Sequence, residues 1–258
     1  MNADHIKIQE DRFCGRLAEN LAAVAGGGAV ERSDCVADLR RLTGGTLLRG
    51  QLEGRYPLGR ALWVRLGGKG GLFAKRADAV VLKGLSLIRL ERLVQDGGDD
   101  EPMDVGRLNA VLSEQADWSK RNVCRMVAGL FSPTGWTDEA AAFIRNDPPG
   151  SGWASAVVHP ILIGPAITDL AWDRSSDVLR QYVQCFCGLT AAERQKVCSD
   201  YLQRRLLVDE FAHLQTAADE LGLDLATVKA VAAEIAKDGK RYAVTTISGV
   251  GLVIKKKL

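Results

Sequence analysis

Residues 215–239, QTAADELGLDLATVKAVAAEIAKDG, contain two apolar patterns of helical spacing separated by a glycine. Small and apolar residues recur where two short helices would pack against each other: Ala217, Ala218, Leu221, Leu223, Val228, Ala232 and Ile235. Gly222 lies between the two patterns and allows a tight turn, because glycine adopts backbone angles that other residues avoid. The stretch therefore predicts two helices joined by a short turn.

The flanking residues extend this pattern. A helix that ends near Leu214 precedes the pair, and the alternating runs KRYAVTTI (240–247) and LVIKKKL (252–258) follow it, joined by SGVG. Alternation on both sides of a glycine-containing turn predicts a β-hairpin. Residues 204–258 thus resemble winged-helix domains, in which the closing hairpin is the wing.

The winged-helix resemblance implies sites for nucleic acid. Such domains commonly place the second helix of the pair, here residues 224–237, in the major groove of DNA. Its polar candidates are Thr227, Lys229 and Lys237, and it has no Arg, Asn or Gln for bidentate base contacts. The hairpin carries five cations suited to phosphate contacts: Lys240, Arg241, Lys255, Lys256 and Lys257. We expect binding to the nucleic-acid backbone; a winged helix that contacts only protein is the alternative.

The formal net charge of +2 conceals a basic segment. Between Arg40 and Arg92 the chain has twelve Lys or Arg and three acids, whereas QDGGDDEPMD (95–104) has five acids and no base. Clustered cations attract phosphate backbones because binding releases condensed counterions. The candidates for phosphate contacts in the segment are Arg55, Arg60, Arg65, Lys69, Lys75 and Arg76. A solvated surface or an acidic protein partner would explain the same charges.

Four glycines surround Lys69 in residues 63–76, WVRLGGKGGLFAKR. A Walker phosphate loop is excluded, because Trp63 stands where that loop needs glycine and Gly70 where it needs Ser or Thr. The pentapeptide GGKGG after an apolar strand resembles the junction in splicing-associated factors of the silencing-defective type, whose ubiquitin-like domain is cut after its second glycine. This resemblance implies a β-grasp fold for residues 4–71 and a processing site at Gly67, Gly68 and Lys69. A surface turn and an anion-binding backbone nest are the alternatives.

The whole pattern predicts an α+β protein that is mostly helical. A small mixed unit (1–68), with a resemblance to the β-grasp fold, would contain strands at IKIQ (6–9), TLLRGQLEG (46–54) and RALWVRL (60–66). A basic helical segment (69–95, with a helix over 77–95), an acidic linker (96–104), a helical domain (105–203) and the winged helix (204–258) would follow.

Several classes of protein are excluded or disfavoured by the sequence. The longest apolar stretch, VVHPILIGPAI (157–167), is too short to span a bilayer, and the polar N-terminus has no signal-peptide core. The six cysteines show no CxxC pairing, and no nucleophile, base and orienting group form a motif. We expect a non-enzymatic intracellular protein, in cytoplasm or nucleus, without metal or cofactor, that assembles with nucleic acid and protein partners. A winged-helix transcriptional regulator and a structural subunit are the alternatives.

Overall fold

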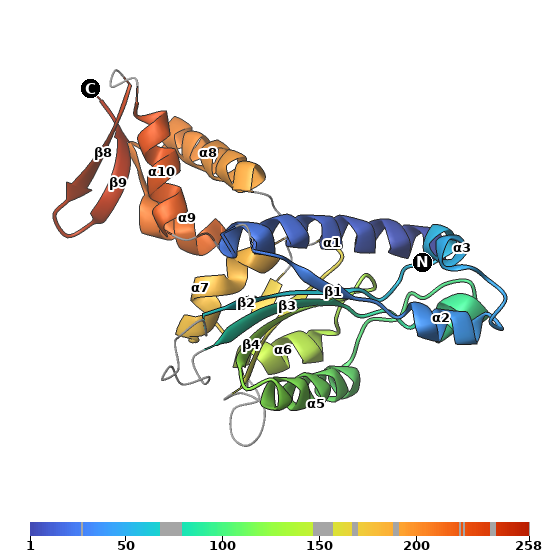
Figure 1. Ribbon diagram of the computed structural model, residues 1–258. Helices are drawn as coiled ribbons and strands as arrows, with labels where there is room; N and C mark the ends of the chain where they lie inside the picture. Colours follow the sequence, from blue (N-terminus) through green and yellow to red (C-terminus); the bar gives the residue numbers. More distant parts are fainter. Residues whose placement is uncertain are drawn as a thin grey trace. The chain divides into compact units, whose positions relative to one another are not determined.

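The computed structural model describes residues 1–26, 28–67, 79–146, 157–166, 170–187, 191–221, 223, 225–237 and 241–257. The chain forms two compact units, Met1–Gly188 and Leu189–Leu258. Figure 1 traces the course of the chain through both. About 51% of the chain is helical and 23% is strand, which confirms a mixed α/β protein.

The first unit is built on a six-stranded sheet with the strands in sequence order. The strands are β1 (Glu31–Ser33), β2 (Ala61–Leu66), β3 (Val80–Ser86), β4 (Arg125–Phe131), β5 (Val158–Ile163) and β6 (Leu170–Trp172). The first three are antiparallel, β3, β4 and β5 are parallel, and β6 is antiparallel to β5. Because the central strands are covered on both faces, their sequences are mostly apolar and do not alternate, although β3 includes Lys83.

Helices cover both faces of this sheet (Figure 1). On one face α1 (Ala3–Val24) and α7 (Asp177–Phe186) pack around Phe13, Phe131 and Phe186. On the other face α5 (Val105–Arg121) and α6 (Asp138–Asn146) enclose an aliphatic core. Three short helices, α2 (Val36–Leu42), α3 (Arg49–Arg55) and α4 (Leu90–Gln95), pack together in a smaller cluster.

Charged groups attach α1 to the start of β2. The carboxylate of Glu10 is fully buried and accepts hydrogen bonds from the backbone N–H groups of Leu58 (2.7 Å) and Arg60 (2.9 Å). The next residue, Asp11, forms an ion pair with the Arg60 guanidinium at 2.5 Å. Two adjacent helix residues thus fix both the backbone and the side chain at the beginning of the strand.

The second unit has the order α8 (Ala191–Val208), β7 (Phe211–His213), α9 (Leu214–Leu221), α10 (Leu225–Ile235), β8 (Tyr242–Ile247) and β9 (Gly251–Lys256). Its antiparallel sheet has β9 between β7 and β8. A separate core joins the three helices to the sheet through buried residues that include Leu202, Leu206, Leu214, Val228 and Ile254. The predicted two-helix element with a following hairpin is therefore present. The helix that was expected to end near Leu214 ends at Val208 instead, because residues 211–213 form a strand of the sheet.

Three predictions of secondary structure near the N-terminus are wrong. Residues 6–9 lie in α1, because Ile6 begins a series of buried residues at helical spacing that continues through Phe13 and Leu17. Residues 49–54 lie in α3, which begins where the Gln51 side chain accepts a hydrogen bond from Leu48 N at 2.9 Å. The helix expected over 77–95 is instead β3 followed by the short α4.

The predicted helical domain over 105–203 is also wrong, because it contains β4, β5 and β6. Short apolar runs that are buried on both faces cannot be distinguished from buried helix by periodicity alone. Strands from the expected 1–68, 69–95 and 105–203 segments pair with one another in a single sheet. The second compact unit begins at Leu189.

The close approach of α7 to β4 depends on a glycine. A Cβ atom at Gly129 would overlap the ring of Phe186, so Gly129→Ala should lower the free energy of unfolding by about 1–3 kcal/mol. The control is Gly15→Ala in α1, where an added Cβ atom meets nothing within 4 Å. This substitution should raise the free energy of unfolding by about 0.5–1 kcal/mol. Urea denaturation with unchanged m-values measures both. A Gly129→Ala protein as stable as wild type would contradict this packing.

A buried lysine on β3 produces a second prediction. Lys83 donates to Gln115 Oε1 at 2.9 Å, and its ammonium lies 4.4 Å from the ring centre of Trp118 and 5.5 Å from that of Trp63. Burial lowers its pKa from 10.5, although Glu114 opposes the shift. The folded chain therefore releases this proton at lower pH than the unfolded chain does, and the contribution of Lys83 to stability rises with pH up to about 10.5.

The test compares wild type with Lys83→Met by urea denaturation between pH 7 and pH 10.5. The free energy of unfolding of the wild type should rise relative to that of the variant as the pH rises. Only the wild type has the buried Lys83 ammonium, which loses its unfavourable charge over this range. A difference in free energy that is independent of pH would contradict the shifted pKa.

Candidate nucleic-acid interface

The β8–β9 hairpin is formed by strand-favouring residues and a glycine turn. YAVTTI (242–247) is rich in β-branched and aromatic residues, which fit a pleated surface. Gly249 (φ 76°) and Gly251 (φ 100°) adopt positive φ angles in the turn, and Val250 N donates to Ile247 O at 3.0 Å. The turn fixes a register in which Ala243 is opposite Lys255 and Tyr242 is opposite Lys256.

This register collects cations at the end of the hairpin that is far from the turn. Lys257 N donates to Arg241 O at 2.8 Å, so these two residues lie beside each other. Side chains alternate along a strand, which places Lys255 and Lys257 on one face. All three side chains are exposed, whereas Val253, two residues earlier on that face, is buried. The exposed part of the face is therefore its basic end.

An aromatic pair on β7 borders these cations. Phe211 pairs with Lys255 in the sheet and is 36% exposed. His213 is on the same strand face, and the two ring centres are 5.6 Å apart at an angle of 68°. We call the surface formed by Phe211, His213, Arg241, Lys255 and Lys257 the basic sheet end.

The basic sheet end combines two kinds of contact that nucleic acids use. Ammonium and guanidinium groups bind phosphate oxygens, and an exposed aromatic ring can stack on a base. Arg241, Lys255 and Lys256 form no ion pair within the described ranges. Their positive charge is consequently available to an external anion.

The predicted contacts on α10 are less favourable. Lys229 is exposed, Thr227 is half-buried, and Lys237 forms an ion pair with Glu234 at 3.0 Å. The remaining exposed positions include Ala226, Ala230 and Ala233. This helix surface offers little hydrogen bonding to base edges.

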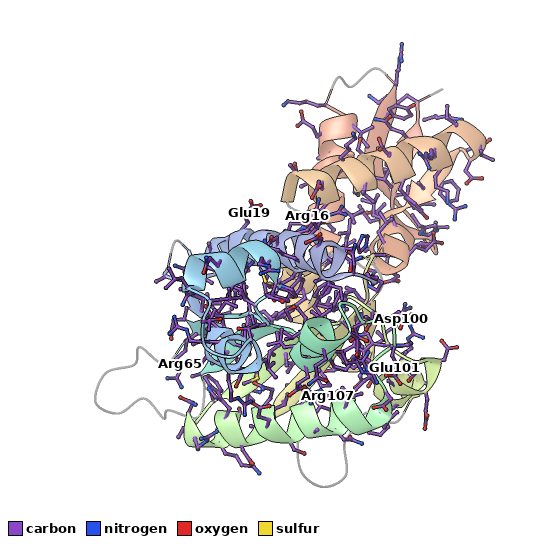
Figure 2. The ribbon with its side chains drawn as sticks, turned by 90° about the vertical axis from the view of Figure 1, so that its right-hand side faces the viewer. Arg16, Glu19, Arg65, Asp100, Glu101 and Arg107 are labelled. Carbon is purple, nitrogen blue, oxygen red and sulfur yellow. The ribbon has the colours of Figure 1, made fainter. Side chains whose placement is uncertain are left out.

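Part of the basic segment is paired with acids inside the first unit. The acidic stretch that was expected to be a linker folds back on it: Asp99 accepts two hydrogen bonds from Arg89, at 2.7 and 2.9 Å. Glu101, labelled in Figure 2, pairs with Arg92 at 2.6 Å. Arg49 similarly pairs with Asp34 and Glu53, both at 2.6 Å. Part of the local surplus of positive charge is therefore offset by acids within the fold.

The individual candidates in the basic segment have different surroundings. Arg60 is engaged by Asp11 and is largely covered, whereas Arg55 is exposed at the end of α3. Arg65 is an exposed residue of β2 (Figure 2) and donates to Asn122 O at 2.7 Å. Gly67 follows β2 with a φ of 73°. The remaining candidates lie outside the described residues: Gly68, Lys69, Lys75, Arg76 and Lys240.

The sequence analysis missed Phe211 and His213. The tripeptide FAH has the alternation of a strand, but three residues after a long helix are too short a signal to predict one. Only the pairing of β7 with β9 places its side chains beside Lys255. Pairing between strands that are distant in the sequence cannot be predicted from the spacing of neighbouring residues.

Other kinds of site receive no support within the described ranges. These contain no group of three His, Cys, Asp or Glu side chains placed to hold a metal ion. None of their helices is long and apolar enough to span a bilayer. All six cysteines are free, and four of them are buried.

Comparisons with protein-family models, with curated proteins and with solved structures found no match.

Proposed function

We propose that the protein is a non-enzymatic, nucleic-acid-associated assembly factor whose second unit is a winged helix that binds the phosphate backbone. The order of elements supports this proposal: a helix, a strand, two helices joined by a short turn, and a hairpin whose last strand lies in the middle of the sheet. In such a unit the hairpin is the wing.

The observation that carries the proposal is the basic sheet end. Arg241, Lys255 and Lys257 lie close together beside Phe211. Like charges at neighbouring positions of a sheet repel one another, and a bound polyanion relieves that repulsion. The exposed ring of Phe211 adds a surface on which an unpaired base can stack.

Binding of this kind is independent of sequence. Phosphate contacts carry no information about the bases, and α10 has no Arg, Asn or Gln for bidentate base contacts. The protein would thus bind nucleic acid through its phosphate backbone, whatever the base sequence, and would do so within a larger assembly. A transcriptional regulator with a defined operator is the less favoured function, since it needs side chains that form specific hydrogen bonds with base edges.

The test measures the salt dependence of binding by the full chain. Fluorescence anisotropy with single-stranded and duplex 24-mers of mixed sequence, between 50 and 200 mM NaCl, gives the slope of log K against log salt. The variant R241A/K255A/K256A/K257A removes the hairpin cations. The control K120A/R121A/R125A/R145A removes four exposed cations from the first unit.

The wild type should bind all sequences similarly, with affinity that falls steeply as salt increases. For the single-stranded oligonucleotide, the slope of log K against log salt should be smaller in magnitude by about 3 in the hairpin variant. Each of the four lost phosphate contacts contributes about 0.7 to that slope. The control should retain the wild-type slope. Equal losses in both variants, or no loss in the hairpin variant, would overturn the proposal.

A further inference from the structure

Helix α8 has an apolar face that is covered and, opposite to it, a mixed apolar and charged face that is exposed. Cys198, Leu202 and Leu206 recur at intervals of four residues and are buried in the core of the second unit. The opposite side of the helix carries a second stripe, which we call the outer stripe, with the spacing of a heptad repeat. It consists of Val197, Asp200, Arg204, Leu207 and Val208.

The apolar members of the outer stripe are strongly exposed. Leu207 is 78% exposed, Val208 is 85% exposed and Val197 is 40% exposed. Single exposed apolar residues are common on protein surfaces, but Leu207 and Val208 are adjacent and share a helix face with Val197, an arrangement that suits a protein contact. The buried face already anchors α8, so the outer stripe is not needed for the core of this unit.

The two charges of the outer stripe have no partners among the residues that the structure describes. Asp200 and Arg204 are four residues apart on the helix, a spacing at which opposite charges often pair. Neither forms an ion pair or a side-chain hydrogen bond with any part of the chain that the structure describes. Both charges are therefore free to meet an opposite charge on another molecule.

The order of residues in the outer stripe is complementary to itself in the antiparallel direction. If two α8 helices pack antiparallel and are centred at the level of Leu202, Asp200 of each faces Arg204 of the other. The same arrangement places Val197 opposite Leu207. Each contact occurs twice, as a symmetric two-fold interface requires.

A groove beside the outer stripe provides space for a partner side chain. It has a volume of about 530 Å³, and the residues that line it are Val197, Asp200, Tyr201, Arg204, Arg205, Val208, Asp209 and Leu221. Its wall is held in place, because Tyr201 donates to Glu220 at 2.6 Å and Arg205 donates to Tyr201 at 3.2 Å. Leu207 of a second copy would lie near Val197 at the edge of this groove.

We infer that the outer stripe of α8 is the interface of a symmetric dimer of this chain, with the two α8 helices antiparallel. The inference goes beyond the proposed function and does not depend on nucleic-acid binding. It commits to a second copy because the charges Asp200 and Arg204 complement each other in that arrangement. A dimer would present two basic sheet ends in one assembly.

The test is a charge exchange followed by sedimentation equilibrium of the full chain at 1–200 μM. Asp200→Arg and Arg204→Asp each place like charges against each other, so each should raise the dimer dissociation constant at least tenfold. The combined variant D200R/R204D restores opposite charges across the interface and should regain most of the wild-type affinity. Gln203→Glu, on the flank of α8, is the matched control and should leave the dimer unchanged.

A second measurement tests the register of the two helices. An equimolar mixture of Val197→Cys and Leu207→Cys chains should form a disulfide-linked heterodimer on mild oxidation, whereas each variant alone should cross-link much less. Circular dichroism confirms that the exposed substitutions leave the fold intact. A wild type that is monomeric at 200 μM, or a charge-exchanged protein that stays as weak as the single variants, would overturn the inference.

Discussion

The position of β9 between β7 and β8 is the constraint from which the proposed nucleic-acid binding follows. This pairing places Lys255 next to Phe211 on one side and Ala243 on the other, and it brings Arg241 beside Lys257. Each side chain alone is an ordinary surface residue. Held at one end of a sheet, they form a positive surface with an aromatic border, and the mutual repulsion of the cations makes an external polyanion a favourable partner.

Cations of this chain differ in whether the fold supplies them with an acidic partner. In the first unit, acids that are distant in sequence or in the adjacent acidic stretch engage the arginines: Asp11 pairs with Arg60, and Asp99 pairs with Arg89. These ion pairs connect elements of the fold, so the arginines that form them are not available to an external ligand. In the second unit Arg241 and Lys255 have no such partners in the described ranges. The charge available to a ligand is therefore decided by three-dimensional pairing and not by local composition.

The sequence predicted the second unit better than the first for a physical reason. Helices α9 and α10 and the β8–β9 hairpin depend on local signals, namely apolar spacing and glycine turns, which a single sequence displays. Strand β3 is buried on both faces, so VVLKGLS shows no alternation and was assigned to a helix. Arg60 could not be recognised as an internal residue, because its partner lies on α1, and Phe211 was missed because its role depends on pairing with β9.

The most direct test of the central claim is photo-cross-linking of the full chain to a single-stranded oligonucleotide that carries 4-thiothymidine, followed by mass spectrometry of the peptides. The account predicts cross-links at Phe211 or His213 and in the hairpin peptides that contain Arg241 and Lys255. It also predicts that they disappear when salt is raised. Cross-links confined to the first unit, or cross-links in the hairpin that persist at high salt, would contradict it.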